Sequence, residues 1–492
     1  MFNKYFNKFL NYGIAVVLFF ALLMSTGLVR HYYKMSKSSG AVIIIVYIVC
    51  LIMYMRYKSK FNLLIDLNNK KSIVYVLLGA FILRLLWIIF IPTEPTSDFG
   101  LMYSYAEEVA NGSYYGFKDY AYFARFAHDT ITVLYFSIFY HITENPLMII
   151  KFLNVIWGTL SVYFLYLTIK EVSERKNAII GAMILGSFPA FIMYTSETMS
   201  ENIAMPFYLL GIYMFLRGLR EKNGIKYYLM CGLALSIANM FRMVGAVFLL
   251  AFLVYTLVYK GIKKSIKSFP VIFLSYWILI FIISQSLLFF EITETHLWNS
   301  KEPSITSILK GTNVEFHGRW NEEDAKVPEE QNYDAEKIKE VSKSIIVNRF
   351  KNTPIHKTIG HYMVKLASQW GSGDFGASGW SIVDASNTRI SIFMKDSIPE
   401  INIFINLIYM TMLIGVLKSL IMYNYITSKK INFFFILFGG FVLLYLISET
   451  QERYGFIISW VVVLFSASFK DTRSITQDES LIIRGKEDEK AS

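Results

Sequence analysis

Residues 72–100 read SIVYVLLGAFILRLLWIIFIPTEPTSDFG, and this stretch indicates both the class of fold and the place of a functional site. The segment 72–91 is apolar and close to the ~20 residues that a helix needs to cross a bilayer. Prolines and polar residues follow, then Asp98, then an amphipathic segment that ends at Asn111-Gly112. The pattern predicts a carboxylate held at a membrane surface, between a spanning helix and a helix that lies on that surface.

Two interpretations of Asp98 are open at this point. Ser97 or Asp98 can cap the following helix, because Ser and Asp side chains accept hydrogen bonds from the free N–H groups of a first turn. Alternatively, a carboxylate at the interface is well placed to act on a substrate carried by a lipid. The rest of the sequence bears on this choice.

The composition excludes a soluble globular protein. Hydrophobic residues make up 54% of the chain, its mean hydropathy is +0.43, and it holds 33 Tyr and 41 Phe. The first apolar run, 10–29, lacks a small-residue cleavage site and a second run follows at once, which favours a retained helix over a signal peptide. Cys50 and Cys231 both lie in apolar runs, which predicts no disulfide framework. The net charge of +11 does not by itself indicate nucleic acid, because in such a chain the location of the charges matters more than their sum.

Apolar runs that could cross a bilayer recur along the whole chain. The candidate spans are residues 10–29, 41–56, 72–91, 147–169, 177–195, 201–219, 227–240, 242–259, 270–290, 400–420, 431–448 and 454–470. The connections rich in Lys and Arg are 56–71, 170–176, 217–226, 260–267 and 429–430. Because cytoplasmic loops carry the excess of basic residues, these connections are assigned to the cytoplasm. The sequence predicts an all-α polytopic membrane protein with about twelve transmembrane helices and both termini in the cytoplasm.

One further apolar segment, 126–142, tests this topology. If it crossed the bilayer, every later basic connection would lie outside. It is therefore predicted to lie as a helix in the outer interface, to which His128 and Asp129 near its start are suited. The outer face then holds four segments: 92–146, 196–200, 291–399 and 449–453.

The chain accordingly divides into five regions. They are an N-terminal transmembrane hairpin with a cytoplasmic loop (1–71), a catalytic transmembrane core with the outer loop 92–146 (72–290), an extracytoplasmic loop region of about 100 residues (291–399), C-terminal transmembrane helices (400–470), and a cytoplasmic disordered tail (471–492). In the extracytoplasmic region, 322–350 is predicted to be one helix with a solvated face. Trp320, Trp370 and Trp380 lie beside glycines and polar residues, which suits sugar stacking and interfacial anchoring equally.

Ionisable groups near the outer ends of the spans are candidates for chemistry, because such groups are costly in a membrane. They are Arg84, Lys151, Glu197, Glu201, Arg242, Glu449, Glu452 and Arg453. Each alone is explained equally well by snorkelling of a cation or capping by a carboxylate, but all lie on the side of Asp98. Cations around an outer pocket suggest an anionic lipid headgroup, since guanidinium groups bind phosphate oxygens in pairs. With a polyprenyl phosphate bound there, Asp98 could deprotonate an acceptor hydroxyl while the cations offset the charge on the leaving phosphate.

These residues occur in short motifs whose order is similar to that of a known family. The motifs are Arg84 to Pro92 leading to Ser97-Asp98 and Tyr103-Ser-Tyr-Ala106, Asn111-Gly112, Lys151 to Gly158, Phe188-Pro189, Ser196-Glu197, Ser200-Glu201-Asn202, Asn239 to Arg242, Gly311-Thr-Asn313, Gly318-Arg-Trp320 and Glu452-Arg453-Tyr454. Over about residues 72–470 the chain resembles the C-type (GT-C fold) glycosyltransferases. Within them it is similar to the set related to protein O-mannosyltransferases and lipid A aminoarabinose transferases, which is glycosyltransferase family 39-like.

The resemblance implies an inverting transfer of a sugar from a polyprenyl-phosphate donor to an acceptor hydroxyl on the outer face. Asp98 corresponds to the catalytic carboxylate of the family, and Arg242 and Arg453 are expected near the donor phosphate. Lys151 and Arg84 join them as candidate phosphate ligands. Trp320, Tyr103 and Tyr454 are candidates for sugar or acceptor binding.

The chain departs from the family in the acidic pair of the first outer loop, because Phe99 follows Asp98 where many relatives have a second acid. Asp129, Asp119 and Glu201 are the candidates for that second acid, and the sequence does not choose among them. No spacing of His and Cys indicates a dedicated metal site, so no cofactor is certain, although family members can hold a divalent metal near the carboxylates.

Other classes of function stay open. A polytopic transporter or a flippase for lipid-linked sugars would place charges near the midplane and show paired repeats, which this sequence lacks. A non-catalytic assembly partner in wall synthesis would tolerate loss of Asp98. The expected partners are a lipid-linked sugar donor, the membrane, and an acceptor glycan, lipid or protein, with no nucleic acid. The composition, rich in Lys, Ile and Asn, suggests a bacterial plasma membrane and a wall polymer or surface lipid as acceptor.

Overall fold

The structure is a computed structural model that describes residues 2–64, 69, 71–422 and 430–468. Across these residues it is all α-helical, and the β structure within them is one isolated bridge between Thr93 and Ala385. The predicted disordered tail, 471–492, lies outside the described residues. The predicted all-α class is confirmed.

Seven helices are long and apolar enough to cross a membrane, and a bent pair can form an eighth span. The seven are α1 (Phe2–Ser36), α2 (Ser38–Leu64), α3 (Ser72–Phe90), α7 (Leu147–Val172), α10 (Glu201–Arg220), α13 (Ile262–Phe289) and α19 (Ile398–Met422). The bent pair comprises α8 (Arg175–Ser187) and the segment that contains α9 (Pro189–Met193), with an angle of 60° between them. The chain is thus a polytopic membrane protein.

Shorter apolar helices complete the bundle. They are α11 (Ile225–Phe241), α12 (Gly245–Lys260), α20 (Ile431–Ile447) and the described part of the last helix, α21 (Phe456–Ser468). At a rise of 1.5 Å per residue, helices such as α12 are shorter than the ~30 Å hydrocarbon core. For this reason length and composition support fewer full spans than the twelve apolar runs counted in the sequence.

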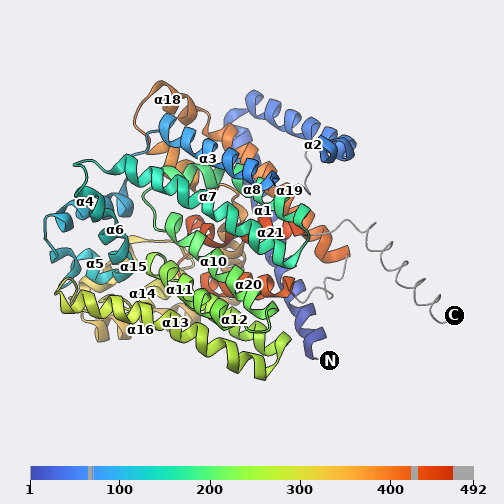
Figure 1. Cartoon of the computed structure of the whole chain (residues 1–492). Helices are drawn as coiled ribbons and strands as arrows, with labels where there is room; N and C mark the ends of the chain where they lie inside the picture. The colour runs from blue at the N-terminus through green and yellow to red at the C-terminus, as the bar shows by residue number, and fades with distance from the viewer. Residues whose placement is uncertain (1, 65–68, 70, 423–429, 469–492) are drawn as a thin grey trace.

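The remaining helices gather mainly at one end of the bundle. They are α4 (Ser97–Ala110), η1 (Tyr115–Phe117), α5 (Tyr122–Arg125), η2 (Ala127–Asp129), α6 (Thr130–Tyr140), η3 (Tyr194–Ser196), α14 (Ile305–Gly311), α15 (Glu322–Glu330), α16 (Ala335–Asn352), α17 (Ile355–Gly371), η4 (Ser378–Val383), α18 (Arg389–Asp396) and η6 (Glu452–Gly455). Figure 1 shows α4 to α6 and α14 to α16 together at its left, whereas α1 begins on the opposite side. Helix α6 covers the apolar part of 126–142 and is too short to cross a bilayer.

The prediction of one helix over 322–350 is wrong, because the chain turns between α15 and α16. Asn332 and Tyr333 take positive φ angles of 49° and 57°, which end α15. Asp334 then caps α16 by accepting hydrogen bonds from the N–H groups of Glu336 and Lys337. The polar composition hid this break, because Asn and Asp fit both a solvated helix face and a turn.

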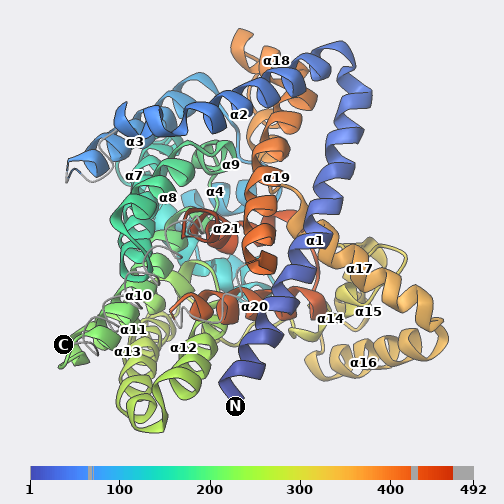
Figure 2. The ribbon, with the colours of Figure 1, turned by 90° about the vertical axis from the view of Figure 1, so that its right-hand side faces the viewer.

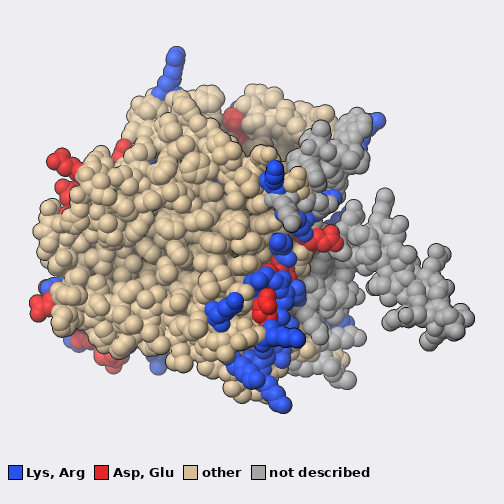
Figure 3. Space-filling view, viewed as in Figure 1, with Lys and Arg blue, Asp and Glu red and all other residues tan. Residues whose placement is uncertain are grey.

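Helix α10 lies between α7 and α11 in the centre of the bundle, and α21 packs against α8 and α19. Figure 2 shows α1 beside α19, while α2 extends along the periphery. Figure 3 shows Lys and Arg gathered at the right of this face, near the ends of α10, α12 and α13, beside a broad surface with few charges. A broad uncharged surface next to a basic rim is typical of a protein that spans a membrane.

Candidate active site

A cavity of about 1180 Å³ lies between the ends of several bundle helices and the helices α14 to α16. Seven of the predicted site residues contribute to its lining: Asp98, Asp129, Glu201, Arg242, Trp320, Arg453 and Tyr454. They come from segments that are far apart in the sequence, which the fold brings to one place. Of the eight ionisable groups expected to converge on the side of Asp98, four line this cavity: Glu201, Arg242, Glu449 and Arg453.

Asp98 is in the first turn of α4, but it does not cap that helix. Thr96 occupies the N-cap position, and no side-chain hydrogen bond caps the helix there. Instead, Oδ1 of Asp98 accepts a hydrogen bond of 2.8 Å from the Tyr122 hydroxyl, and Oδ2 lies 3.9 Å from Nη2 of Arg453. The side chain keeps 46% of its surface exposed at the cavity. It is thus oriented by two neighbours and still open to a ligand.

Arg453, in η6, has a planar guanidinium that lies among aromatic rings. Its Cζ atom is 4.7 Å from the ring centroid of Phe99 and 5.0 Å from that of Trp380. Two of its nitrogens, Nε and Nη1, are buried and have no hydrogen-bond partner in the described structure. Because an unpaired buried donor is costly, this arginine has unused capacity for an anion.

Arg242 ends α11 on the other side of Tyr454. Its Nε atom lies 3.3 Å from Oε1 of Glu201, and its Cζ atom is 5.3 Å from the Tyr454 ring centroid. The Tyr208 hydroxyl donates a 2.6 Å hydrogen bond to the Arg242 carbonyl and fixes this turn. The two arginines therefore flank one aromatic ring at the wall of the cavity.

Two of the three candidates for the second acid reach the cavity. Asp129 is buried there, 3.6 Å from Nε2 of His128, and burial raises the pKa of its carboxyl. Glu201 is buried at the start of α10. Asp119 does not line the cavity; it is exposed, with a φ of 51°, and its backbone N–H donates to Glu294.

Two of the three candidates for sugar or acceptor binding also line the cavity. Tyr454 donates a 3.1 Å hydrogen bond to Glu449, and both side chains line the cavity. Trp320 lines it with 55% of its surface exposed. Tyr103 lies outside it and donates to Asn145.

The structure does not bring Arg84 and Lys151 to this cavity. Arg84 is buried and donates to the carbonyls of Ala80, Leu185 and Gly186. The last two belong to the end of α8, where a helix leaves carbonyls without partners. Lys151 is also buried and donates to the Thr93 carbonyl, at the start of the Asp98 loop.

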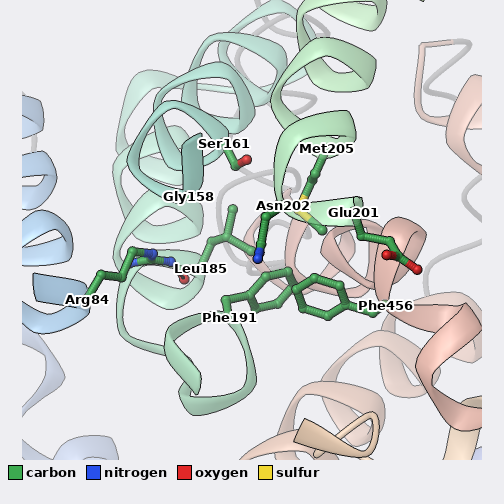
Figure 4. Close-up of a pocket in the computed structure, with 9 residues that line it drawn as sticks. All are labelled: Arg84, Gly158, Ser161, Leu185, Phe191, Glu201, Asn202, Met205 and Phe456. Atoms are coloured by element: carbon green, nitrogen blue, oxygen red, sulfur yellow. Dashed lines mark hydrogen bonds between the residues drawn. The ribbon is translucent and has the colours of Figure 1, made fainter. Parts of the chain in front are cut away.

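A second, small cavity of about 10 Å³ lies inside the bundle. Figure 4 shows Arg84 and Glu201 at opposite sides of it, with Phe191 and Phe456 between them. Its volume is close to that of one water molecule. Glu201 lines both cavities, whereas Arg84 faces only this inner one.

The sequence did not predict the roles that three residues play in the site. Tyr122 binds Asp98, and Phe99 and Trp380 stack on Arg453. In the sequence, Phe99 was notable only because it follows Asp98 at a position where an acid was expected. An aromatic ring at this place holds a cation near Asp98 by a cation–π contact.

The carboxylates of the cavity do not form a metal site as they lie. Among the residues that the structure describes, no three His, Cys, Asp or Glu side chains come close enough to hold a metal ion.

Comparison with known proteins agrees with the resemblance seen in the sequence. Residues 130–289, about a third of the chain, match the profile of the family described as dolichyl-phosphate-mannose-protein mannosyltransferase. This match confirms the predicted resemblance, and the class of enzyme that it implies, for that segment. Asp98 lies before the matched segment and Arg453 after it. No curated protein sequence matches the chain.

Solved structures are similar at low identity. The archaeal oligosaccharyltransferase AglB from Archaeoglobus fulgidus, in complex with an inhibitory peptide and a dolichol-phosphate, shows 14% identity and a TM-score of 0.47 over 88% of this chain. The chain spans about half of that protein, 52%. ArnT from Cupriavidus metallidurans, bound to undecaprenyl phosphate, shows 14% identity and a TM-score of 0.36, with 82% of this chain and 78% of ArnT covered.

Proposed function

We propose that this protein is a membrane glycosyltransferase that moves a sugar from a polyprenyl-phosphate donor to an acceptor hydroxyl, with inversion at the sugar carbon. The observation that carries the proposal is the lining of one large cavity by Asp98, Arg242 and Arg453. A carboxylate and two arginines at one cavity are what such a transfer requires of the protein. The family match supports the class of reaction.

Arg453 and Arg242 are the proposed ligands of the donor phosphate. Nε and Nη1 of Arg453 are buried without a hydrogen-bond partner in the described structure, Nε of Arg242 faces Glu201 at 3.3 Å, and both guanidinium groups lie over Tyr454. A phosphate would supply the missing acceptors, and a guanidinium stays charged in a poorly hydrated place. Arg84 and Lys151 already donate to backbone carbonyls, so in this proposal they support the site from behind.

Asp98 is the proposed general base. It would take the proton of the acceptor hydroxyl while the hydroxyl oxygen bonds to the sugar carbon and the bond from that carbon to the phosphate oxygen breaks. The bonding electrons leave with the polyprenyl phosphate, whose charge Arg453 and Arg242 offset. Attack opposite the leaving phosphate inverts the sugar carbon. Asp129 or Glu201 is the proposed second acid, since both reach the cavity.

We further propose that this cavity faces the outside of a bacterial plasma membrane. The basic connections gather away from the end that holds α4 to α6 and α14 to α16. In this topology, with about twelve spans of which some are short, both termini are cytoplasmic. A wall polymer or a surface lipid is then the acceptor class that such a cavity can reach.

The test is transfer by purified Asp98→Asn protein, supplied with extracted polyprenyl-phosphate sugars and envelope acceptors. Loss of the base should lower the rate about 1000-fold, within the usual range for general base catalysis. Asp119→Asn is the matched control, because Asp119 is in the same loop but is exposed and outside the cavity. Transfer by Asp98→Asn at the wild-type rate would remove Asp98 from the mechanism. A flippase or transporter would instead keep moving lipid-linked sugar across vesicles in the Asn variant.

A further inference from the structure

We infer that the outer wall of the cavity binds an anionic acceptor, a chain of hydroxyl-bearing units that carries phosphate or carboxylate groups. The inference rests on the proposed function and names its acceptor class. It comes from an uneven distribution of charge in the helices that form this wall.

Helix α16 shows only one of its faces to the cavity. Ala335, Lys339 and Lys343 line it, and their spacing of four residues places them on one side of the helix. Glu336 and Glu340 of the same helix are absent from the lining. A mixed-charge helix thus presents only cations to the cavity.

Helix α15 shows the complementary arrangement. It carries Glu322, Glu323, Glu329 and Glu330, yet its contribution to the lining is Ala325. Its acids therefore leave the cavity wall without negative charge. Between α13 and α19, the acid that does line the cavity is Glu302, and Arg125 neutralises it through a 2.7 Å ion pair.

The lysines of this wall are available to a ligand to different degrees. Lys343 makes no ion pair among the described residues. Lys339 pairs with Glu336 at 2.7 Å on the exposed helix surface, where such pairs contribute only ~0–1 kcal/mol. Lys310 is 3.3 Å from Glu449 in a largely buried ion pair, so it is the least available of the three to a ligand.

Trp320 gives the same wall an aromatic surface. More than half of the side chain is exposed at the cavity, as a stacking surface for a sugar or polyol needs. A second indole, that of Trp298, also lines the cavity and stacks on His296 with ring centroids 4.3 Å apart. Cations beside aromatic rings fit a chain that alternates charged and C–H-rich groups.

The donor phosphate could also be attracted to lysines, so the two sources of negative charge must be separated. The proposed donor ligands, Arg242 and Arg453, are at the ends of apolar helices, whereas Lys339 and Lys343 are on a helix of the outer region. Substitution of the lysines should therefore change acceptor binding without changing binding of a lipid phosphate.

The experiment measures binding of three probes to the purified full chain in detergent. The probes are a glycerol phosphate hexamer, the neutral glucose hexamer maltohexaose, and undecaprenyl phosphate. The wild type should bind the anionic hexamer at least about tenfold more tightly than the neutral one, and less tightly as salt screens the charges. The Lys339→Gln/Lys343→Gln variant should weaken that binding at least about fivefold, as two exposed charge contacts would. Trp320→Ala should also weaken it.

Lys337→Gln/Lys351→Gln is the matched control, with the same change of charge on exposed residues of α16 that do not line the cavity. It should leave all three affinities within a factor of two. Equal binding of the neutral hexamer, or an equal loss in the control, would overturn the inference alone, provided that undecaprenyl phosphate still binds. Failure of the wild type to bind undecaprenyl phosphate would instead overturn the proposed function.

Discussion

Two pairs of cations from this chain were both expected at a phosphate, and the structure separates them by what they already bind. Arg84 and Lys151 donate to backbone carbonyls inside the bundle. Arg242 and Arg453 contact aromatic rings and carboxylates at the cavity. Among the described contacts, Arg453 leaves two buried nitrogens, Nε and Nη1, without a hydrogen bond, whereas Arg84 leaves Nε alone. A cation near the end of an apolar helix can thus either hold the fold or bind a ligand. The difference lies in whether neighbouring carbonyls use its donors.

The strongest test of this difference is Arg453→Gln. The change removes the charge and the paired donors proposed for the phosphate, so kcat/KM should fall about 100-fold, which equals about 2.7 kcal/mol of transition-state stabilisation. Thermal unfolding should change little, because two of the lost nitrogens have no hydrogen bond in the protein. Steady-state transfer over a range of donor concentrations measures the first effect and a melting curve the second. A large drop in melting temperature with unchanged dependence on donor concentration would show that Arg453, like Arg84, stabilises the fold and does not bind the donor.

Tyr122→Phe should have the next largest effect on transfer. It removes the hydroxyl that orients Asp98, and a hydrogen bond to a charged group is worth about 1.5–3 kcal/mol, so the rate should fall about tenfold. The donor dependence should stay the same, because Tyr122 touches the carboxylate alone among the proposed groups. Tyr103→Phe is the control, since its hydroxyl donates to Asn145 outside the cavity. Equal rates for Tyr122→Phe and the wild type would show that Arg453 alone orients Asp98.

Arg84→Met should have the opposite effects to Arg453→Gln: it should lower stability and leave the transfer rate nearly unchanged. The carbonyls of Leu185 and Gly186 would lose their donor in a buried place, which should lower the free energy of unfolding by about 2 kcal/mol. The folded fraction should transfer sugar within a factor of two of the wild type and with the same donor dependence. Chemical unfolding in mild detergent, followed by activity at matched folded fraction, measures both. A specific rise in the donor KM would return Arg84 to the phosphate site.

Of these substitutions, Glu197→Gln should change the transfer rate least. It should nevertheless change how the stability of the protein depends on pH. Glu197 lies just after the bent span, both of its carboxyl oxygens are buried without hydrogen bonds in the described structure, and burial raises its pKa to about 8. A carboxyl whose pKa is higher in the folded state favours folding fully below its unfolded pKa, near 4.5. That contribution is lost as the pH rises toward 8.

The wild type should therefore become less stable between about pH 4.5 and 8, and the Gln variant should lose that slope. At pH 7 the two proteins should transfer sugar at similar rates, since a protonated Glu and a Gln are alike in shape and charge. Melting curves at half-unit pH steps give the slope. Identical slopes in the two proteins would show that Glu197 is ionised throughout.

Much of this arrangement could be predicted from the sequence, because the lengths of the apolar runs and the positions of the charges can be read directly along the chain. Asp98, Asp129, Glu201, Arg242 and Arg453 meet at one cavity, as their common side of the membrane predicted. Arg84 could not be told from Arg453 by the same reasoning. Both are arginines near the end of an apolar run, and only the folded chain places the end of α8 beside Arg84.

The span count and the break between α15 and α16 were missed for related reasons. Hydropathy detects an apolar run but not a 60° bend within it. The bend is at Phe188-Pro189, where Phe188 is extended and Pro189 begins α9. The turn before α16 depends on the positive φ angles of Asn332 and Tyr333, and Tyr gives little sign of such a conformation. Both features depend on backbone conformation, which the composition of these segments does not indicate.

The cavity draws its two walls from separable parts of the chain. Groups proposed for the donor come from loops at the ends of bundle helices, whereas α14 to α16 form a continuous stretch, residues 305–352, that contributes the basic wall. Such an arrangement lets one wall diverge while the other stays fixed. Grafting this stretch from a relative with a different acceptor should then exchange acceptor preference as a cassette and leave the donor lipid unchanged.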